Sequence, residues 1–401
     1  MAAPAHLTMK VPRPGEAGSS REFELLFACC RPTLDRNTIS EALSAPISWE
    51  AVLRLADQHR VMPALYQALH GREGVPAGIQ TALQARFQSH SVKALRFSAE
   101  LARIADAFHK SGVEVLAHKG PALAQLLYGD VALRQFGDLD LLVRPRDVPG
   151  AIAALRQAGY EPQLQLSPRQ ARAYLRSGYE YVFGLAAQKN LLELQWRIVP
   201  RFYAVDFNLD AMFERSVGLA VEGVRMEILW REDLMLALCI HAAKHGWEQL
   251  GMLRDIAALT VSGTYWHQVT ASARQIGVHR IVCISMLLTE RLGCAPAPDM
   301  GSANEMRAAK AIADRLISRL VAGEQVHPES FRYFCGWSQN RERWRDRVRF
   351  ISRLALTPSV GEWQSVGLPD ALFPLYHAVR IGRLGWRGVS KTIFGSTPAE
   401  T

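Results

Sequence analysis

The chain has 401 residues, of which 49% are hydrophobic and 21% charged, a composition near the globular average that excludes a disordered or fibrous protein. Its 47 Lys and Arg outnumber 38 Asp and Glu, and the net charge of +9 favours an anionic ligand without identifying one. The six Cys form no CxxC pair, so the sequence indicates neither a disulfide framework nor a zinc ribbon.

The first segment, residues 1–21, is rich in Pro, Gly, Ala and Ser and lacks the apolar stretch of a signal peptide, so we expect a disordered leader. No apolar run reaches the ~18–20 residues that cross a bilayer. The longest run, Leu234 to Ala243, is about half as long. We therefore expect no membrane span and, by default, a cytoplasmic location.

Residues 22–110 have a helical pattern throughout. Ala94, Phe97, Leu101, Ile104 and Phe108 form an apolar stripe with a period near ~3.6 residues, which is typical of an amphipathic helix. Pro and Gly at positions 72–78 separate this helix from the one before it. We expect a helical N-terminal region.

The pattern changes to a mixed α/β core over residues 111–230. A short strand at Val113–Ala117 precedes a helix at Pro121–Tyr128, which Gly129 ends as a left-handed cap. A second strand follows at Leu139–Val143. The remaining expected elements are a helix at 148–158 and a hairpin with strands at 179–186 and 191–198.

Residues 231–325 return to a helical pattern. The expected helices span 232–245, 252–261, 266–292 and 303–322.

The last region, residues 326–401, is strongly basic. From Arg332 to Lys391 there are 11 Lys and Arg but four acids, an excess of +7. Trp337, Trp344 and Phe350 interleave with the arginines. One interpretation is a surface for nucleic acid or anionic lipid. The other, which we favour, is a solvated helix whose Arg stems pack on the aromatic rings.

Acidic residues at the expected second strand are the strongest chemical signal. Residues i and i+2 of a strand share a face, so Asp138 and Asp140 point together. Glu193 and Gln195 share a face of a later strand in the same way. Close carboxylates repel each other unless a cation lies between them, and Mg²⁺ prefers oxygen ligands. The alternative is that all of these side chains simply meet solvent.

Taken together, these motifs resemble the polymerase-beta-type nucleotidyltransferase superfamily, and within it the bacterial family of uncharacterised nucleotidyltransferases (NTP transferase family 5). The resemblance covers about residues 22–388. The matching segments are His118–Ala124, Leu127–Asp130, Arg134, Asp138–Val143, Leu192–Trp196, His241–Trp247 and Arg254-Asp255. It implies an α+β fold in which a small mixed β-sheet nucleotidyltransferase core, residues 111–230, is flanked by mainly helical regions.

The resemblance also implies a reaction and its cofactor. A nucleoside monophosphate would pass from an NTP to an acceptor hydroxyl on a small molecule, a glycan precursor or a peptide, with release of pyrophosphate. Asp138, Asp140 and Glu193 would hold Mg²⁺, or alternatively Mn²⁺, in a two-metal site. The runner-up functions are an RNA-end nucleotidyltransferase and a catalytically idle member that binds nucleotide or a partner. The sequence leaves the acceptor, the preferred NTP and the oligomeric state open.

The turn before the first core helix departs from the superfamily pattern. Where the superfamily usually has Gly-Ser, this chain has Lys119-Gly120-Pro121, and Pro121 offers neither a hydroxyl nor an N–H. Phosphate binding would then rest on Lys119, on backbone N–H groups at Gly120 and beyond, and on Arg134. Gln195 stands where family members often have His.

Two further residues are implied in nucleotide or acceptor binding, His245 and Arg254. His241 and His245 are also spaced as zinc ligands on one helix face, but Ala242 replaces the Glu of an HExxH motif. We therefore expect no zinc protease site, and we leave open whether His241 and His245 take part in catalysis.

Overall fold

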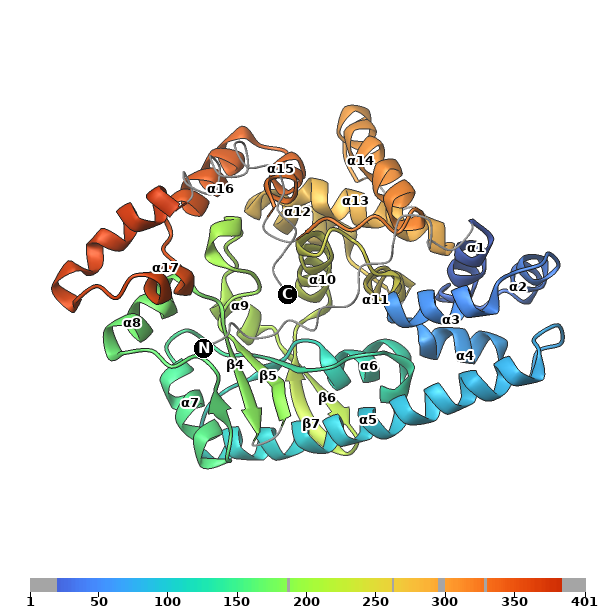
Figure 1. The fold of residues 1–401 in the computed structure, drawn as a ribbon, viewed down its shortest axis with the longest axis horizontal. Coiled ribbons are helices and arrows are strands. Elements are labelled where there is room, and N and C mark those ends of the chain that lie inside the picture. Colours follow the sequence, from blue (N-terminus) through green and yellow to red (C-terminus); the bar gives the residue numbers. More distant parts are fainter. Residues whose placement is uncertain (1–19, 186–187, 262, 295–299, 328–329, 384–401) are drawn as a thin grey trace.

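The computed structural model describes residues 20–185, 188–261, 263–294, 300–327 and 330–383. Within these residues the chain forms a mixed seven-stranded sheet surrounded by helices (Figure 1). The α+β class expected from the sequence is confirmed. Of the expected leader, residues 1–19 lie outside the described residues, and the first helix begins at Ser20. No helix in the described part of the chain is long and apolar enough to cross a membrane.

The sheet has the strand order β3-β4-β5-β2-β1-β7-β6. Its centre is parallel where β2 pairs with β5 and where β1 pairs with β7, and β1 and β2 are antiparallel. The strands are β1 (Leu116–Ala117), β2 (Leu139–Leu142), β3 (Glu161–Pro162), β4 (Glu180–Leu185), β5 (Gln188–Gln195), β6 (Val217–Val221) and β7 (Val224–Ile228).

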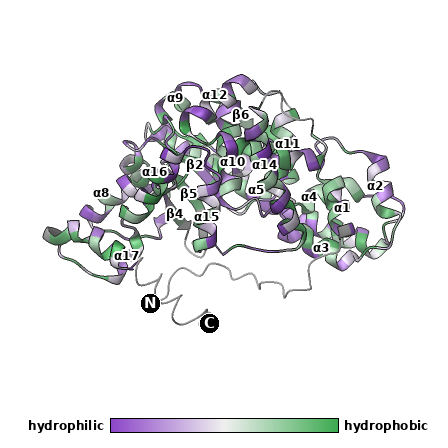
Figure 2. Cartoon of the chain, turned by 90° about the horizontal axis from the view of Figure 1, so that it is seen from above, coloured by the Kyte–Doolittle hydropathy of each residue, from purple (hydrophilic) through white to green (hydrophobic). Residues whose placement is uncertain are grey.

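The N-terminal helices form one end of the molecule, on the opposite side of the sheet from α8 and α17 (Figure 2). They are α1 (Ser20–Cys29), α2 (Arg36–Leu43), α3 (Trp49–Gln58), α4 (Met62–Leu69) and α5 (Ala77–Lys110). The long helix α5 extends from this end to the sheet (Figure 1). The expected apolar stripe lies on it, and Phe97, Leu101, Ile104 and Phe108 are buried in the same cluster as Leu141 of β2.

Helices inserted between the strands are α6 (Gly120–Tyr128), α7 (Val148–Gln157), α8 (Pro168–Ser177) and α9 (Leu209–Glu214). Those that follow the sheet are α10 (Arg231–Lys244), α11 (Leu250–Val261), α12 (Trp266–Ile276), α13 (His279–Thr289), α14 (Ala303–Val321), α15 (Phe331–Gln339), α16 (Trp344–Leu356) and α17 (Val360–Ser365). Short 3-10 turns cover Val131–Leu133, Arg201–Tyr203, Glu290–Leu292 and Asp370–Leu375.

Helix α10 lies between the sheet and helices α12 and α13 (Figure 1). Residues on all of its sides are buried, from Leu234 through Ile240 to Ala243. A helix that is buried on all sides lies inside a core and is held by its neighbours. Its C-terminal end, where Lys244 and His245 lie, is therefore held rigidly.

The element boundaries differ from the expectation in several places. The single helix expected over 266–292 is two helices, because Gly277 adopts a left-handed φ of +68° and caps the first. The hairpin β6–β7 was not expected. It turns through Glu222-Gly223, both with positive φ (46° and 81°), the geometry that favours two-residue hairpins.

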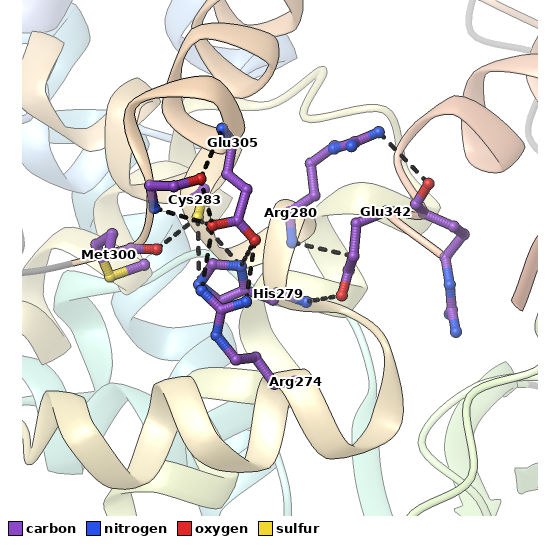
Figure 3. Close-up of polar contacts among 9 residues, drawn as sticks. Arg274, His279, Arg280, Cys283, Met300, Glu305 and Glu342 are labelled. Carbon is purple, nitrogen blue, oxygen red and sulfur yellow. Dashed lines mark hydrogen bonds and ion pairs between the residues drawn. The ribbon is translucent and has the colours of Figure 1, made fainter. Parts of the chain in front are cut away.

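A polar cluster joins α12, α13 and α14 (Figure 3). Arg274 pairs with Glu305 at 2.9 Å, and the buried His279 lies beside the same carboxylate. Glu342, which precedes α16, accepts the backbone N–H groups of His279 and Arg280 and so caps the start of α13. Three helices and the C-terminal segment are thereby tied together.

The C-terminal helices pack against the turn Arg201–Tyr203, which follows strand β5. Trp337 donates its indole N–H to the carbonyl of Tyr203 at 3.3 Å. The fully buried Arg341 donates to the carbonyls of Ala204 and Ile276, both at 3.2 Å. Tyr333 donates its hydroxyl to the carbonyl of Lys244 at 2.5 Å, which connects α15 to the end of α10.

Candidate active site

Two central strands bring the three acidic residues to one place. Asp138 immediately precedes β2 and Asp140 lies within it. In the parallel pairing of β2 with β5, Asp140 is level with Glu193. Side chains at paired positions of neighbouring strands lie on the same face of a sheet, so the two carboxylates are adjacent. Sequence reasoning had left open whether these strands were neighbours.

The turn into α6 packs directly against the aspartates. Gly120 has a left-handed φ of +59°, and a Cβ at this position would lie 3.3 Å from the carbonyl oxygen of Asp138. Only glycine meets both conditions without strain. The backbone N–H of His118 donates to the carbonyl of Asp140 at 3.0 Å. The start of α6 is thereby fixed beside the carboxylates.

Lys119 supplies the nearest positive charge. Its Nζ lies 2.6 Å from Oδ1 of Asp140, and both side chains are largely buried. Gln195 donates its amide to Asp140 Oδ1 and to Glu193 Oε2, both at 3.0 Å. The contacts to this group of three carboxylates thus come from one ammonium, that of Lys119, and one amide, that of Gln195.

The pKa values reflect this shortage of positive charge. Burial opposes the ionisation of Asp140, but Lys119, His118 and Arg134 together outweigh it, and the pKa of Asp140 lies below its ordinary value. Burial and the charge of Asp140 raise the pKa of Asp138 to about 6. Burial, together with Glu180 and Asp140, raises the pKa of Glu193 to about 8. The Asp138 and Glu193 carboxylates would thus be stabilised by an additional cation.

The end of α10 contributes nitrogen groups to the same region. Lys244 donates to the Tyr179 hydroxyl at 3.1 Å, and burial lowers the pKa of its ammonium. The His241 and His245 rings lie 4.7 Å apart. Burial and the neighbouring Lys244 lower the pKa of His245 to about 3, so this imidazole is neutral at pH 7.

Arg134 and Arg254 connect the loop before β2 to helix α11. Arg134 Nε donates to Asp255 at 2.9 Å, and Tyr128 donates its hydroxyl to the other oxygen of that carboxylate at 2.8 Å. Arg254 donates to the carbonyl of Leu133 at 2.7 Å, and its guanidinium lies 4.1 Å from the Tyr128 ring centre. Both arginines are thus partly used to position the site.

The carboxylates suit a hard divalent cation in their chemistry. They offer only oxygen donors, and among the described residues Lys119 alone forms an ion pair with them. Among the described residues, no three or more His, Cys, Asp or Glu side chains are already gathered into a metal-binding group. The donor atoms are of the kind that Mg²⁺ prefers, and an ion bound here would compete with the Lys119 ammonium for Asp140.

Sequence reasoning did not assign a role to Lys244, Tyr128 or Arg60. A lysine directly after the mainly apolar run from Leu234 to Ala243 was a usable signal for Lys244, since a buried charge requires partners. Tyr128 gave no such signal, because a tyrosine at the end of an amphipathic helix is ordinary. Arg60 gave no signal either, because it lies about 60 positions before the core motifs in the sequence. Only the fold places it in the same cavity lining as Arg134 and Arg254.

The mixed sheet, the glycine turn into α6, the two aspartates at the start of β2 and the glutamate level with Asp140 on β5 are consistent with a nucleotidyltransferase domain. The chain belongs to the family described as uncharacterised nucleotidyltransferase, whose sequence model matches residues 45–293. The expected family is confirmed. No curated protein and no solved structure matches the chain. Because the chain belongs to this family, its general activity is nucleotidyl transfer and its substrate class is an NTP.

Proposed function

We propose that the protein transfers a nucleoside monophosphate from an NTP to an acceptor hydroxyl on a small molecule, a glycan precursor or a peptide, and releases pyrophosphate. The observation that carries the proposal is the placement of Glu193 level with Asp140 on the parallel neighbour of β2, beside Asp138. Three adjacent carboxylates facing one ammonium create a site that a cation–polyphosphate complex would neutralise.

The chain's own residues bind and orient the reactants in this proposal. The backbone N–H groups at the start of α6 favour a phosphate, because they lack partners within the helix and the helix dipole is positive there. Lys119, which leads into this turn, adds a charge-assisted hydrogen bond. His245 is neutral and can contact the nucleotide or acceptor through hydrogen bonds without adding charge.

Asp138, Asp140 and Glu193 would hold Mg²⁺, with Mn²⁺ as the alternative, and the ion would neutralise charge on the phosphate oxygens. We assign Glu193 as a ligand rather than as the base. The acceptor oxygen attacks the α-phosphorus and gives its proton to solvent water, while the bond between the α-phosphorus and the leaving pyrophosphate breaks. Positioning and electrostatic stabilisation supply most of the rate enhancement.

The test is pyrophosphate release from each NTP with Mg²⁺ over a panel of acceptors. We expect Asp138→Asn and Asp140→Asn each to lower kcat by at least ~100-fold, the scale of losing a group that stabilises transition-state charge. Asp106→Asn, at an exposed Asp on α5 that pairs with Lys110, is the matched control and should keep full activity. Full activity in either site variant would contradict the proposal.

The same panel separates an active enzyme from the idle alternative. An idle member would bind an NTP and show a rise in melting temperature, since a ligand at ~100 times its Kd adds ~2.7 kcal/mol to the unfolding free energy. It would release no pyrophosphate with any acceptor.

A further inference from the structure

Arg60 lies on the turn between α3 and α4 and has an unusual backbone. Its φ is +55°, a left-handed value that L-residues other than Asn and Asp adopt rarely. The turn is pressed against the start of α11: Gly251 donates its N–H to the carbonyl of His59 at 3.0 Å. A Cβ on Gly251 would lie 3.1 Å from the carbonyl oxygen of Arg60. Packing thus holds Arg60 in a conformation that its own preference disfavours.

The exposed side chain of Arg60 has no hydrogen-bond or ion-pair partner among the described residues. Arg134 and Arg254, by contrast, each donate to a protein oxygen. A guanidinium has five N–H donors in a planar fork that matches a phosphate or carboxylate. Arg60 therefore offers a complete, unused set of donors.

Arg60, Arg134, Arg254 and His241 line one small cavity. Its volume is about 40 Å³, more than the ~10–15 Å³ that one water needs, so there is room for a small polar group. Asp255 is the acid of the lining, and Arg134 and Tyr128 already engage it. Three guanidinium groups against one carboxylate leave the cavity positive.

The cavity adjoins the region of the catalytic carboxylates. Arg134, which lines it, comes four residues before Asp138, and His241 lies one turn before His245 at the end of α10. His241 lines the cavity and also responds to the charge of Lys119. An anion held by Arg60 would therefore lie next to the site at which nucleotidyl transfer is proposed.

We propose that Arg60, with Arg134 and Arg254, binds a phosphate group of a substrate in this cavity. The inference deepens the proposed function and rests on it for the identity of the substrate. The phosphate belongs either to the polyphosphate of the nucleotide or to a phosphorylated acceptor. In both cases the N-terminal helices contribute a residue that contacts substrate.

The test is isothermal titration of the full chain with inorganic pyrophosphate and with glycerol 3-phosphate. We expect Arg60→Gln to weaken binding of at least one probe by 10-fold or more. The dissociation constant of Arg60→Lys should lie between those of the wild type and Arg60→Gln, because Lys keeps the charge but lacks the planar fork of donors. Arg36→Gln, an exposed charge change on α2 in the same helical region, is the matched control and should bind as the wild type does.

The two probes separate the sources of the phosphate. A loss confined to pyrophosphate supports a nucleotide phosphate, and a loss confined to glycerol 3-phosphate supports a phosphorylated acceptor. Unchanged dissociation constants for both probes in Arg60→Gln, or no binding of either probe to the wild type, would overturn the proposal.

Arg60→Gly distinguishes the side chain from the strained backbone. It should relieve the strain at φ +55° and raise the melting temperature, while losing phosphate binding as Arg60→Gln does. Retained binding in this variant would also overturn the proposal. These titrations need no turnover, so a wild type that transfers no nucleotide would refute the proposed function and still leave the role of Arg60 measurable.

Discussion

Lys119 stabilises the buried, ionised carboxylate of Asp140. Asp140 is 3% exposed, and a buried carboxylate without a partner would be strongly destabilising. The 2.6 Å contact with Lys119 and the hydrogen bond from Gln195 make this carboxylate stable as an anion. Asp138 and Glu193 lack an ion-pair partner among the described residues, and the energetic cost of the site is concentrated on them.

His59 makes stability depend on pH. Its side chain is 3% exposed and packs edge-on against Phe23, and burial lowers its pKa from 6.5 to about 4. Between these pH values the unfolded chain binds a proton that the folded chain does not, so the unfolding free energy falls as pH drops from 6.5 to 4. We expect His59→Leu to make this fall shallower in urea titrations at several pH values.

His109→Leu is the control for the pH experiment, since His109 is exposed near the end of α5 and its ring stays in water in both states. An identical pH slope in wild type and His59→Leu would show that His59 does not contribute.

At the scale of residues, the sequence predicted the acidic set but not its partners. Alternation in a strand placed Asp138 with Asp140, and Glu193 with Gln195, because side-chain direction is a local property. The register that sets Asp140 level with Glu193 joins residues 53 positions apart, and local patterns carry no information about it. Lys119 was expected to bind phosphate, and its contact with Asp140 became visible only in the fold.

Helix α14 is a single element whose start can be tested. Ser302 caps it by accepting the N–H of Glu305, while Glu305 accepts the N–H of Ser302, a reciprocal capping box. Glu305 also pairs with Arg274 of α12. We expect Ser302→Ala to lower the unfolding free energy by about 1 kcal/mol, measured from the urea midpoint.

Ser318 of the same helix provides the comparison. Among the described residues its hydroxyl bonds only to the carbonyl of Asp314 one turn earlier, and Ser318 is exposed. Ser318→Ala should be neutral or slightly stabilising, because Ala has the higher helix propensity. An equal loss of unfolding free energy in Ser302→Ala and Ser318→Ala would mean that the cap does not stabilise the helix.

At the scale of elements, helices were predicted better than strands. The structure places α10 and α14 within a few residues of the expected boundaries, because the 3.6-residue period repeats over several turns. Strands β1 and β3 have two residues each, too few to show a period. The split between α12 and α13 depends on the left-handed Gly277, and a glycine in a helical pattern does not by itself reveal its φ.

At the scale of the whole molecule, much of the basic C-terminal charge has an internal partner. Arg349 and Arg353 pair with Asp206, Arg380 and Arg383 pair with Glu362, and Arg341 is fully buried. Arg387 and Lys391, which contribute to the excess counted from the sequence, lie outside the described residues. Composition predicted the charge of this region, but ion pairs between distant residues follow only from the fold.

We therefore expect weak RNA binding. A fluorescent single-stranded RNA should bind in the ~10⁻⁴–10⁻⁶ M range of non-specific complexes, with a log–log salt slope that corresponds to few phosphate contacts. Anisotropy at salt concentrations from 50 to 200 mM, about the range over which such slopes are read, provides the measurement. A log–log slope of about −4 or steeper, which corresponds to six or more phosphate contacts on a single strand, would instead favour the RNA-end nucleotidyltransferase.

The hydroxyl of Tyr333 reaches the carbonyl of Lys244 across 89 positions of sequence, and this has a consequence for biosynthesis. The helix that ends beside the carboxylates leaves the ribosome well before the segment that covers its last turn. Trp337 and Phe350, both buried, arrive later still. The nascent chain thus exposes apolar surface around Tyr203 until α15 and α16 are translated, and a ribosome stalled before α15 would release an aggregation-prone protein.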